Sequence, residues 1–240
     1  MFARGVIAPL LTPFSDDLSI AADLYIAHAQ WLLEQGCTGI APFGTTGEAL
    51  SVGIDERIAA IRALLDSGID PALVIPGTGL TNVADTARLS RACLDMGCAA
   101  VMTLPPFYFK GVSGDGLYAY FEQLIATLGS DARIFLYHIP PIAVVGIPPA
   151  LAKRLHRNFP GQVVGIKDSS GDWGNTQELL EIDDLIVYPG SELPLLDALE
   201  RGAPGCISAT ANVNAAAIAK INVLGIGMIT FDRLVHRQER

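Results

Sequence analysis

Short apolar runs alternate with helical patterns along the whole chain. The runs are rich in β-branched residues and mostly continuous in hydrophobicity, which is typical of strands covered on both faces. They span residues 5–11, 39–43, 72–76, 99–104, 133–137, 163–167, 185–188 and 205–208. Apolar residues recur at helical spacing between them, over residues 22–35, 54–65, 83–96, 116–128, 149–159, 175–181 and 193–201. This alternation predicts βα units that share one parallel sheet.

Eight such units predict an α/β fold, a closed (β/α)8 or TIM barrel. Many of the expected helices end at a glycine, as helices commonly do: these are Gly36, Gly68, Gly97, Gly129 and Gly202. An open doubly wound sheet is the alternative, but no Gly-x-Gly-x-x-Gly sequence follows the first apolar run and such sheets have fewer strands.

The expected organisation is one domain, with the barrel over residues 1–214. Residues 215–240 are expected to form an atypical short C-terminal tail that is not a separate domain. The tail contains Gly225 and Gly227 and no clean helical stripe. Because each glycine costs about 1 kcal/mol relative to alanine in a helix interior, we expect no regular helix there.

Composition and charge argue against several classes of partner and site. The net charge is −9 and the isoelectric point about 4.8, without a basic block, which argues against nucleic acid and anionic membranes as partners. No apolar run reaches the roughly 18 residues that span a bilayer, and no signal peptide is recognisable. The four cysteines form no Cys-x-x-Cys pair, and the histidines are scattered. We therefore expect buried, reduced thiols, no metal site and a cytoplasmic protein.

Lys167 is the strongest candidate for chemistry. It ends the apolar run 163–166 and precedes Asp168 and Ser169, so it should lie at the mouth of a buried strand. Aliphatic surroundings disfavour the charged form of an amine, and a neutral amine attacks ketones to form a Schiff base. The other three lysines of the chain do not end so apolar a strand.

Further polar residues follow the other expected strands, at the rim where barrel enzymes place their chemistry. The turn Gly44-Thr45-Thr46-Gly47-Glu48, expected to enter a helix, fits an anion site or an ordinary capped turn equally well. Tyr137 should neighbour Lys167 on the adjacent strand, either as a proton shuttle or as a packed ring with its hydroxyl in water. His138 should face the opposite side in a structural role. Tyr108 could belong to an apolar loop cluster.

Five motifs together resemble the dihydrodipicolinate synthase / N-acetylneuraminate lyase superfamily, in its order and spacing, from Gly5 to about Asn214. They are Gly44-Thr-Thr-Gly-Glu48, Pro106-Phe-Tyr108, Tyr137-His-Ile-Pro140, Gly165-Ile-Lys-Asp168 and Gly205-Cys-Ile-Ser-Ala-Thr-Ala-Asn212. The resemblance implies a TIM barrel and a class I aldolase mechanism with pyruvate as the Schiff-base partner. It also implies that no cofactor is needed, and a homotetramer built as a dimer of dimers.

The resemblance also assigns roles to single residues. Lys167 matches the Schiff-base lysine and Tyr137 the proton-shuttling tyrosine. Thr45 and Thr46 match the pair that links the proton relay and holds the pyruvate carboxylate. Tyr108 matches the tyrosine that completes the relay in a neighbouring subunit. Pocket-lining positions are matched by Gly190 and Ile207.

One departure from the family pattern concerns the second substrate. Dihydrodipicolinate synthases carry an arginine that binds the carboxylate of aspartate semialdehyde, and Ile142 occupies that position here. Losing such a charge-assisted hydrogen bond costs about 1.5–3 kcal/mol. We therefore expect a lyase acting on a 2-keto-3-deoxy sugar acid or a related 2-keto acid. Ser191, Glu192 and Ser208 are suited to bind its hydroxyls, although capping or surface roles fit them as well.

Two alternatives remain. The first is the 4-hydroxy-tetrahydrodipicolinate synthase reaction, which joins pyruvate and aspartate semialdehyde. The second is a truncated, non-catalytic paralogue, because the resemblance implies further helices after the eighth strand whereas this chain ends at Arg240.

Overall fold

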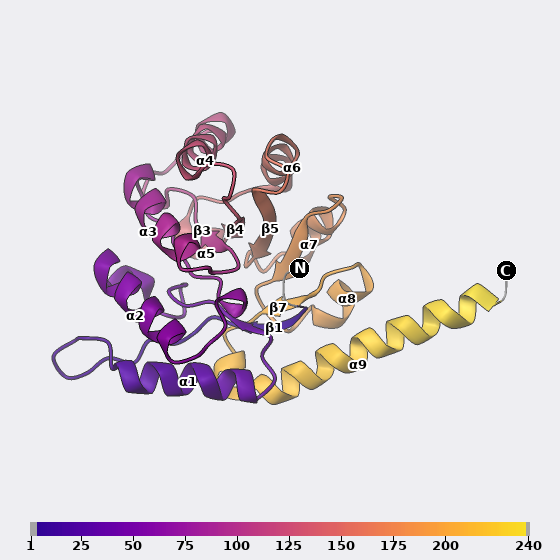
Figure 1. The fold of residues 1–240 in the computed structure, drawn as a ribbon. Helices are drawn as coiled ribbons and strands as arrows, with labels where there is room; N and C mark the ends of the chain where they lie inside the picture. Colours follow the sequence, from indigo (N-terminus) through magenta and orange to yellow (C-terminus); the bar gives the residue numbers. More distant parts are fainter. Residues whose placement is uncertain (1–3, 239–240) are drawn as a thin grey trace.

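The strands form a closed parallel ring. The computed structural model describes the backbone of residues 4–238 and the side chains of residues 4–227. Two parallel ladders are present, in the orders β2-β1-β7 and β3-β4-β5-β6. Their strands are β1 (Gly5–Ala8), β2 (Gly39–Ile40), β3 (Val101–Thr103), β4 (Ile134–His138), β5 (Val163–Asp168), β6 (Ile186–Pro189) and β7 (Gly205–Ile207). The helices surround this ring (Figure 1), so the predicted (β/α)8 barrel is confirmed.

The third predicted strand, residues 72–76, is not a regular strand, and that prediction was wrong. The segment begins with the 3-10 helix η2 (Pro71–Leu73), which Asp70 caps by accepting from Ala72 N at 2.9 Å. Single parallel bridges then join Val74 to Ile40 and Gly77 to Met102. Pro76 has no N–H to donate, so a continuous ladder cannot form. The segment still fills the third place of the barrel between β2 and β3.

The outer helices follow the predicted segments closely. They are α1 (Ala22–Glu34), α2 (Ile54–Asp66), α3 (Val83–Asp95), α4 (Gly114–Leu128), α6 (Pro149–Asn158), α7 (Trp173–Leu180) and α8 (Leu195–Glu200). The five predicted stop glycines all have positive φ, between 78° and 101°, a conformation that costs glycine least. Besides η2, two short elements were not predicted: η1 (Ala49–Ser51) and α5 (Pro140–Ala143).

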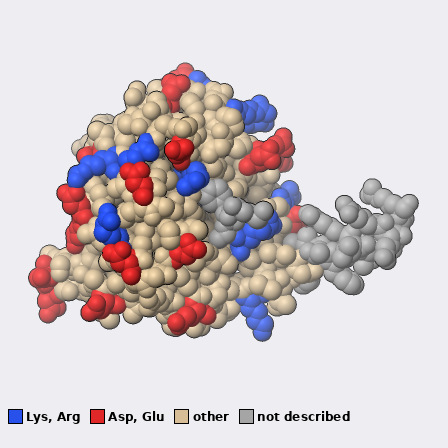
Figure 2. Space-filling view, viewed as in Figure 1, with Lys and Arg blue, Asp and Glu red and all other residues tan. Residues whose placement is uncertain are grey.

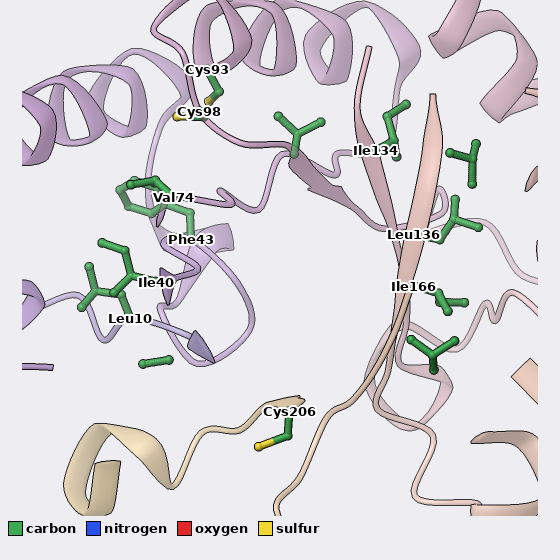
Figure 3. Packing of buried hydrophobic residues seen from close by; sticks show 14 of the residues in the cluster. Leu10, Ile40, Phe43, Val74, Cys93, Cys98, Ile134, Leu136, Ile166 and Cys206 are labelled. Carbon is green, nitrogen blue, oxygen red and sulfur yellow. The ribbon is translucent and has the colours of Figure 1, made fainter. Parts of the chain in front are cut away.

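Alternation along the strands divides the core into two layers. In β4, Phe135 and Tyr137 belong to the cluster inside the barrel, together with Ile7, Met102 and Ile207. Their neighbours Ile134 and Leu136 belong to the cluster between strands and helices, part of which Figure 3 shows. This period of two is what places Tyr137 and, on β5, Lys167 on the inner face.

All four cysteines are buried and unpaired, as predicted. Burial raises the pKa of the Cys37 and Cys98 thiols to about 11 and that of Cys206 to about 12. These thiols are therefore protonated and poorly nucleophilic at neutral pH.

The last helix, α9 (Ala211–Gln238), contradicts the expectation of an irregular tail. It kinks at Asn214 (φ −141°, ψ 35°) and continues as a helix past Gly225 and Gly227, extending beyond α8 (Figure 1). Gly225 has a packing reason, because a Cβ there would lie 2.9 Å from methyl groups of Leu196 and Leu199. Gly225 therefore lowers the stability of the helix by about 1 kcal/mol relative to alanine, but it allows α9 to lie close to α8.

Asn212 closes the ring by tying the start of α9 to the first βα unit. Its side-chain N–H groups donate to Pro9 O at 2.9 Å and to Ala209 O at 3.0 Å. Its oxygen accepts from Leu11 N at 3.3 Å and lies 2.9 Å from His28 Nε2. The donors and the acceptor of the Asn212 amide thus all have hydrogen-bond partners within the protein, so the role of this side chain is structural.

The surface is mixed in charge. Figure 2 shows acidic and basic side chains interspersed on the visible face, without a basic patch. The ion pairs Arg88–Asp55 and Arg154–Asp115 are exposed, and such pairs contribute at most about 1 kcal/mol each. None of the helices in the described part of the chain is long and apolar enough to cross a bilayer.

Candidate active site

Lys167 and Tyr137 meet at the carboxyl ends of adjacent strands. They are register partners in the β4–β5 ladder, which confirms that they are neighbours. Lys167 is only 4% exposed, and its Nζ donates to the Tyr137 hydroxyl at 3.4 Å. That hydroxyl lies 3.1 Å from Thr45 Oγ1. The three polar atoms therefore form a continuous row, Nζ–OH–Oγ1, along which protons can move.

The amine is not held in an ion pair. Among the described residues, no carboxylate lies within ion-pair distance of Lys167. The adjacent carboxylate, Asp168, faces the outer layer and accepts from Thr176 Oγ1 at 2.6 Å, Asn175 Nδ2 at 3.0 Å and Ser170 N at 2.9 Å. The hydrogen bond to Tyr137 is long for its kind. Lys167 Nζ is thus buried, weakly bound and available to react.

The loop with Thr45 and Thr46 differs from the prediction in one respect. It does not enter an α-helix directly, because Glu48 is followed by η1 and α2 starts only at Ile54. A helix dipole therefore contributes little to anion binding here. The loop is closed by Glu48 N donating to Thr45 O at 3.2 Å and Ala49 N donating to Gly44 O at 3.3 Å.

Arg57 anchors this loop, a role that was not predicted from the sequence. Its side chain is only 2% exposed and donates from Nε to Val52 O at 3.0 Å and from Nη2 to Ala49 O. The spacing contained the signal, since Arg57 shares the buried stripe of α2 with Ile61 and Leu64, at i, i+4 and i+7. An arginine in such a stripe must find acceptors inside the protein.

A cavity of about 200 Å³ opens beside the row of polar atoms. Its wall runs from the loop after β2, across the ends of β3 and β4, to α5. Thr45 and Tyr137 line it, whereas Lys167, whose Nζ donates to the Tyr137 hydroxyl, is not among the lining residues. The remaining wall is mostly apolar, with Leu104, Ile139 and Ile142 among its side chains.

The opposite side of the barrel mouth carries the other predicted pocket residues. Ile207 is fully buried in β7. Gly190 donates to Asp168 O at 2.6 Å, and a Cβ on it would overlap Ser169, so packing alone explains this glycine. Ser191 Oγ accepts from Leu193 N at 3.2 Å, as a turn cap does. Their contact with substrate stays a prediction.

Glu192 and Ser208 are paired with each other. The Ser208 hydroxyl donates to the Glu192 carboxylate. Burial pushes the pKa of Glu192 upward, but hydrogen bonds from Ser208, the backbone and Thr210 outweigh burial and leave that pKa below its ordinary value. The carboxylate is therefore charged at neutral pH and already partly occupied by intramolecular donors.

Tyr108 does not join the row in its own chain. It is 78% exposed on the loop after β3, with its ring edge-on to Phe109 at 5.7 Å between centroids. A role in the site of a second subunit, as the resemblance implies, stays a prediction. Within the part of the chain that the structure describes, no three His, Cys, Asp or Glu side chains gather as metal ligands do.

His138 has the predicted structural role. Its Nδ1 accepts from Ile147 N at 2.7 Å, which fastens the segment after α5 to β4. Burial lowers the pKa of His138, although the nearby Asp168 carboxylate acts in the opposite direction.

This lowered pKa predicts a pH dependence of stability. Below its ordinary value of 6.5, the unfolded chain binds a proton at His138 that the folded chain does not, so the free energy of unfolding falls as the pH falls. Thermal melts from pH 7.5 to pH 5.5 should therefore show a smaller decline in Tm for His138→Gln than for the unsubstituted protein. Identical declines would remove His138 as the cause.

The comparisons with known proteins agree with this geometry. Residues 2–225 match the model of the dihydrodipicolinate synthetase family. The chain is 36% identical over 208 residues to an uncharacterised DapA-like lyase of Chloroflexus aurantiacus, covering 86% of this chain and 69% of that protein. It is 36% identical over 211 residues to a 4-hydroxy-tetrahydrodipicolinate synthase of Thermus thermophilus, covering 87% and 69%.

Solved structures show the same architecture. Dihydrodipicolinate synthase from Agrobacterium tumefaciens superposes with a TM-score of 0.90 at 39% identity, over 92% of this chain and 78% of that one. YagE of Escherichia coli K12, a prophage protein of the family solved with pyruvate, gives a TM-score of 0.85 at 26% identity, over 95% and 78%. With its family match, its barrel and its order of strand-end residues, this chain belongs to the dihydrodipicolinate synthetase family and is a lyase.

Proposed function

We propose that this lyase is a pyruvate-dependent class I aldolase that cleaves or forms a C–C bond in a 2-keto-3-deoxy sugar acid or a related 2-keto acid. The observation that carries the proposal is the buried Lys167 amine, which has no ion-pair partner among the described side chains and lies 3.4 Å from the Tyr137 hydroxyl. A primary amine in this setting forms an imine with a ketone, and the adjacent phenol supplies the proton transfers that imine formation needs.

The reaction follows from the row of polar atoms. The Lys167 amine adds to the keto carbon of pyruvate, and water leaves as the imine forms. Loss of a proton from the methyl carbon gives an enamine, which attacks the carbonyl carbon of an aldehyde. The new alkoxide takes a proton from the Tyr137 hydroxyl, which Thr45 Oγ1 at 3.1 Å helps to reprotonate. Hydrolysis then frees the amine. Cleavage is the reverse sequence.

Ile142 bears on the aldehyde half. It lines the cavity beside Tyr137 and is 62% exposed. Its aliphatic side chain offers no hydrogen-bond donor to a carboxylate, which argues against aspartate semialdehyde as the partner. The complex of YagE with pyruvate supports pyruvate as the keto acid.

We also propose that the protein forms a homotetramer and lies in the cytoplasm. The exposed Tyr108 suits the role of reaching Thr45 of a second copy within a homotetramer, where its hydroxyl would continue the proton relay. Four buried free thiols suit the reducing cytoplasm.

Borohydride trapping tests the chemistry. Incubation of the purified protein with pyruvate and sodium borohydride should reduce the imine and leave a stable adduct on Lys167, located by peptide mass spectrometry. Borohydride without pyruvate is the control. An unmodified Lys167, under conditions that label another class I aldolase, would contradict the proposal and favour a non-catalytic paralogue that binds a keto acid without turnover.

A further inference from the structure

Residues 139–147, called the α5 segment below, lead from the end of β4 to α6 and include the short helix α5. Ile139 and Ala143 belong to the buried cluster inside the barrel that also contains Tyr137, and both line the same cavity wall as Tyr137. Ile147, at the other end, is fully buried in the outer cluster between strands and helices. The segment therefore packs beside Tyr137 at one end and is anchored in the outer layer at the other.

One hydrogen bond ties the α5 segment to the sheet. The other backbone hydrogen bonds of the segment are internal, between residues 142–144 and the carbonyl oxygens one turn earlier. Among the described residues, the bond from Ile147 N to His138 Nδ1 at 2.7 Å is the one that joins the segment to a strand. Val144 has a φ of 63°, a strained conformation for a β-branched residue. The segment thus needs a tether, and the imidazole of His138 provides it.

His138 is a fixed point for this bond. It is the register partner of Asp168 in the β4–β5 ladder, and its carbonyl oxygen accepts from Ser169 N at 2.7 Å. Only 6% of the residue is exposed. Because Nδ1 accepts from Ile147 N, it carries no proton, so the imidazole is neutral with its proton on Nε2. Burial favours this neutral form, since it lowers the pKa of His138.

The backbone of the α5 segment also lies against the imidazole. A Cβ added to Gly146 would lie 2.8 Å from His138 Cε1 and 3.2 Å from His138 Nδ1. A side chain at this position would therefore push the segment away from the ring, or the ring away from Ile147 N. Glycine at position 146 thus allows the close approach that the 2.7 Å hydrogen bond requires.

The position of the Tyr137 hydroxyl is sensitive to how its ring is packed. The hydroxyl lies 3.4 Å from Lys167 Nζ and 3.1 Å from Thr45 Oγ1, and the first of these distances is long for a hydrogen bond. Ile139 and Ala143 share the buried cluster with the ring, and closely packed interiors transmit small shifts. Displacement of the α5 segment would therefore move the hydroxyl out of the row of polar atoms.

On the basis of the function proposed above, we propose that His138 is a positioning residue for the lyase reaction. By holding the α5 segment in place, it keeps the Tyr137 hydroxyl between Lys167 and Thr45. His138 itself exchanges no proton with the substrate, so its effect on the reaction passes through Tyr137. A residue that served stability alone would not depend on the Tyr137 hydroxyl in this way.

The test measures how fast pyruvate forms its imine on Lys167, so the aldehyde is not needed. The purified full chain is mixed with pyruvate and quenched with sodium borohydride after increasing times, and the Lys167 adduct is quantified by peptide mass spectrometry. His138→Leu removes the acceptor of the Ile147 N–H. It should slow adduct formation by about tenfold or more, since a misplacement of about 1 Å can cost about 10²-fold. His138→Asn should restore most of the rate, because its amide oxygen is as many bonds from the backbone as Nδ1.

A double-mutant cycle shows whether His138 acts through Tyr137. In the Tyr137→Phe background the hydroxyl is already absent, so adding His138→Leu should slow adduct formation much less than it does alone. A residue that only stabilises the fold would slow both proteins by the same factor.

His156→Leu is the matched control. Its Nδ1 lies 2.7 Å from Val163 O at the start of β5, whereas Lys167 lies near the other end of that strand. This variant loses an imidazole contact of the same length, so it should lower Tm but leave the rate of adduct formation unchanged. Gly146→Ala is a second perturbation of the α5 segment. It keeps His138 in place and should also slow adduct formation.

Three results would overturn the inference. The first is an unchanged rate in folded His138→Leu or, if that variant does not fold, in Gly146→Ala. The second is equal slowing in His138→Asn and His138→Leu. The third is slowing by the same factor with and without the Tyr137 hydroxyl. Each of these leaves the proposed function standing as long as the unsubstituted protein forms the adduct, whereas absence of that adduct removes both.

Discussion

Replacing Lys167 with alanine is expected to abolish the borohydride-trapped pyruvate adduct and to lower turnover by about four orders of magnitude or more, the scale seen when a covalent nucleophile is removed. The reason is local. The other two members of the row, Tyr137 and Thr45, offer only hydroxyls and no amine. Neither can therefore take over imine formation. Mass spectrometry of the adduct and a pyruvate-release assay measure the two effects.

Lys167→Met is the control for packing. The lysine side chain is 4% exposed, so alanine leaves a cavity whose cost adds to the loss of the amine. Methionine fills much of the same space with an unbranched apolar chain and removes only the nucleophile. Both variants should lack the adduct, and Lys167→Met should melt closer to the unsubstituted protein. An adduct at another lysine, with turnover retained, would contradict the assignment of Lys167.

The central part of the site was predictable from sequence because two regularities place it. Strand alternation puts Tyr137 and Lys167 on the inner face, and the βα repeat makes β4 and β5 neighbours. Those rules involve only residues close to regular strands. The exact pairing of Tyr137 with Lys167 was not predictable in this way, because it depends on a register shift after Ile134. Ile134 pairs with Val163 but Phe135 pairs with Gly165.

Irregular segments were harder to predict. Residues 72–76 have the composition of a strand, but Pro76 and the 3-10 turn at Pro71–Leu73 limit them to isolated bridges. The helix over Gly225 was missed because its reason is a close approach to Leu196 and Leu199, which no local propensity records. Arg57 was missed because its acceptors, Ala49 O and Val52 O, are backbone atoms of an irregular loop.

The polar residues at the barrel mouth show why the substrate is harder to predict from sequence than the position of Lys167. Sequence reveals that Ser191, Glu192 and Ser208 are polar, but not that Ser208 donates to Glu192. It reveals that Ile142 replaces an arginine, but not that Ile139 and Leu104 line the same cavity. Substrate choice depends on which groups remain free, and only the folded arrangement shows this.

Replacing Tyr137 with phenylalanine is expected to lower kcat by roughly 10²–10⁴-fold, the usual contribution of a general acid or base. The change removes the hydroxyl that lies between Lys167 Nζ and Thr45 Oγ1 but keeps the buried ring. Pyruvate should still form a trappable adduct, because the Lys167 amine is unchanged, but the adduct should form more slowly without the hydroxyl that assists imine formation. Steady-state kinetics should show a large fall in kcat with a KM for pyruvate altered by less than about tenfold.

Tyr120→Phe separates the loss of a proton carrier from the loss of a buried hydroxyl. The Tyr120 hydroxyl donates to Leu80 O at 3.1 Å and lies 3.0 Å from Thr86 Oγ1, between α3 and α4 and outside the row of Lys167, Tyr137 and Thr45. Its removal should cost about 0.5–1.5 kcal/mol of stability and leave kcat unchanged. Tyr137→Phe should instead lower kcat strongly and change the stability little, because the Tyr137 hydroxyl contributes more to the reaction than to the fold. Equal turnover in Tyr137→Phe and the unsubstituted protein would show that the Tyr137 hydroxyl does not transfer protons in the reaction. Thr45, whose hydroxyl contacts that of Tyr137, would then have no connection to the imine on Lys167.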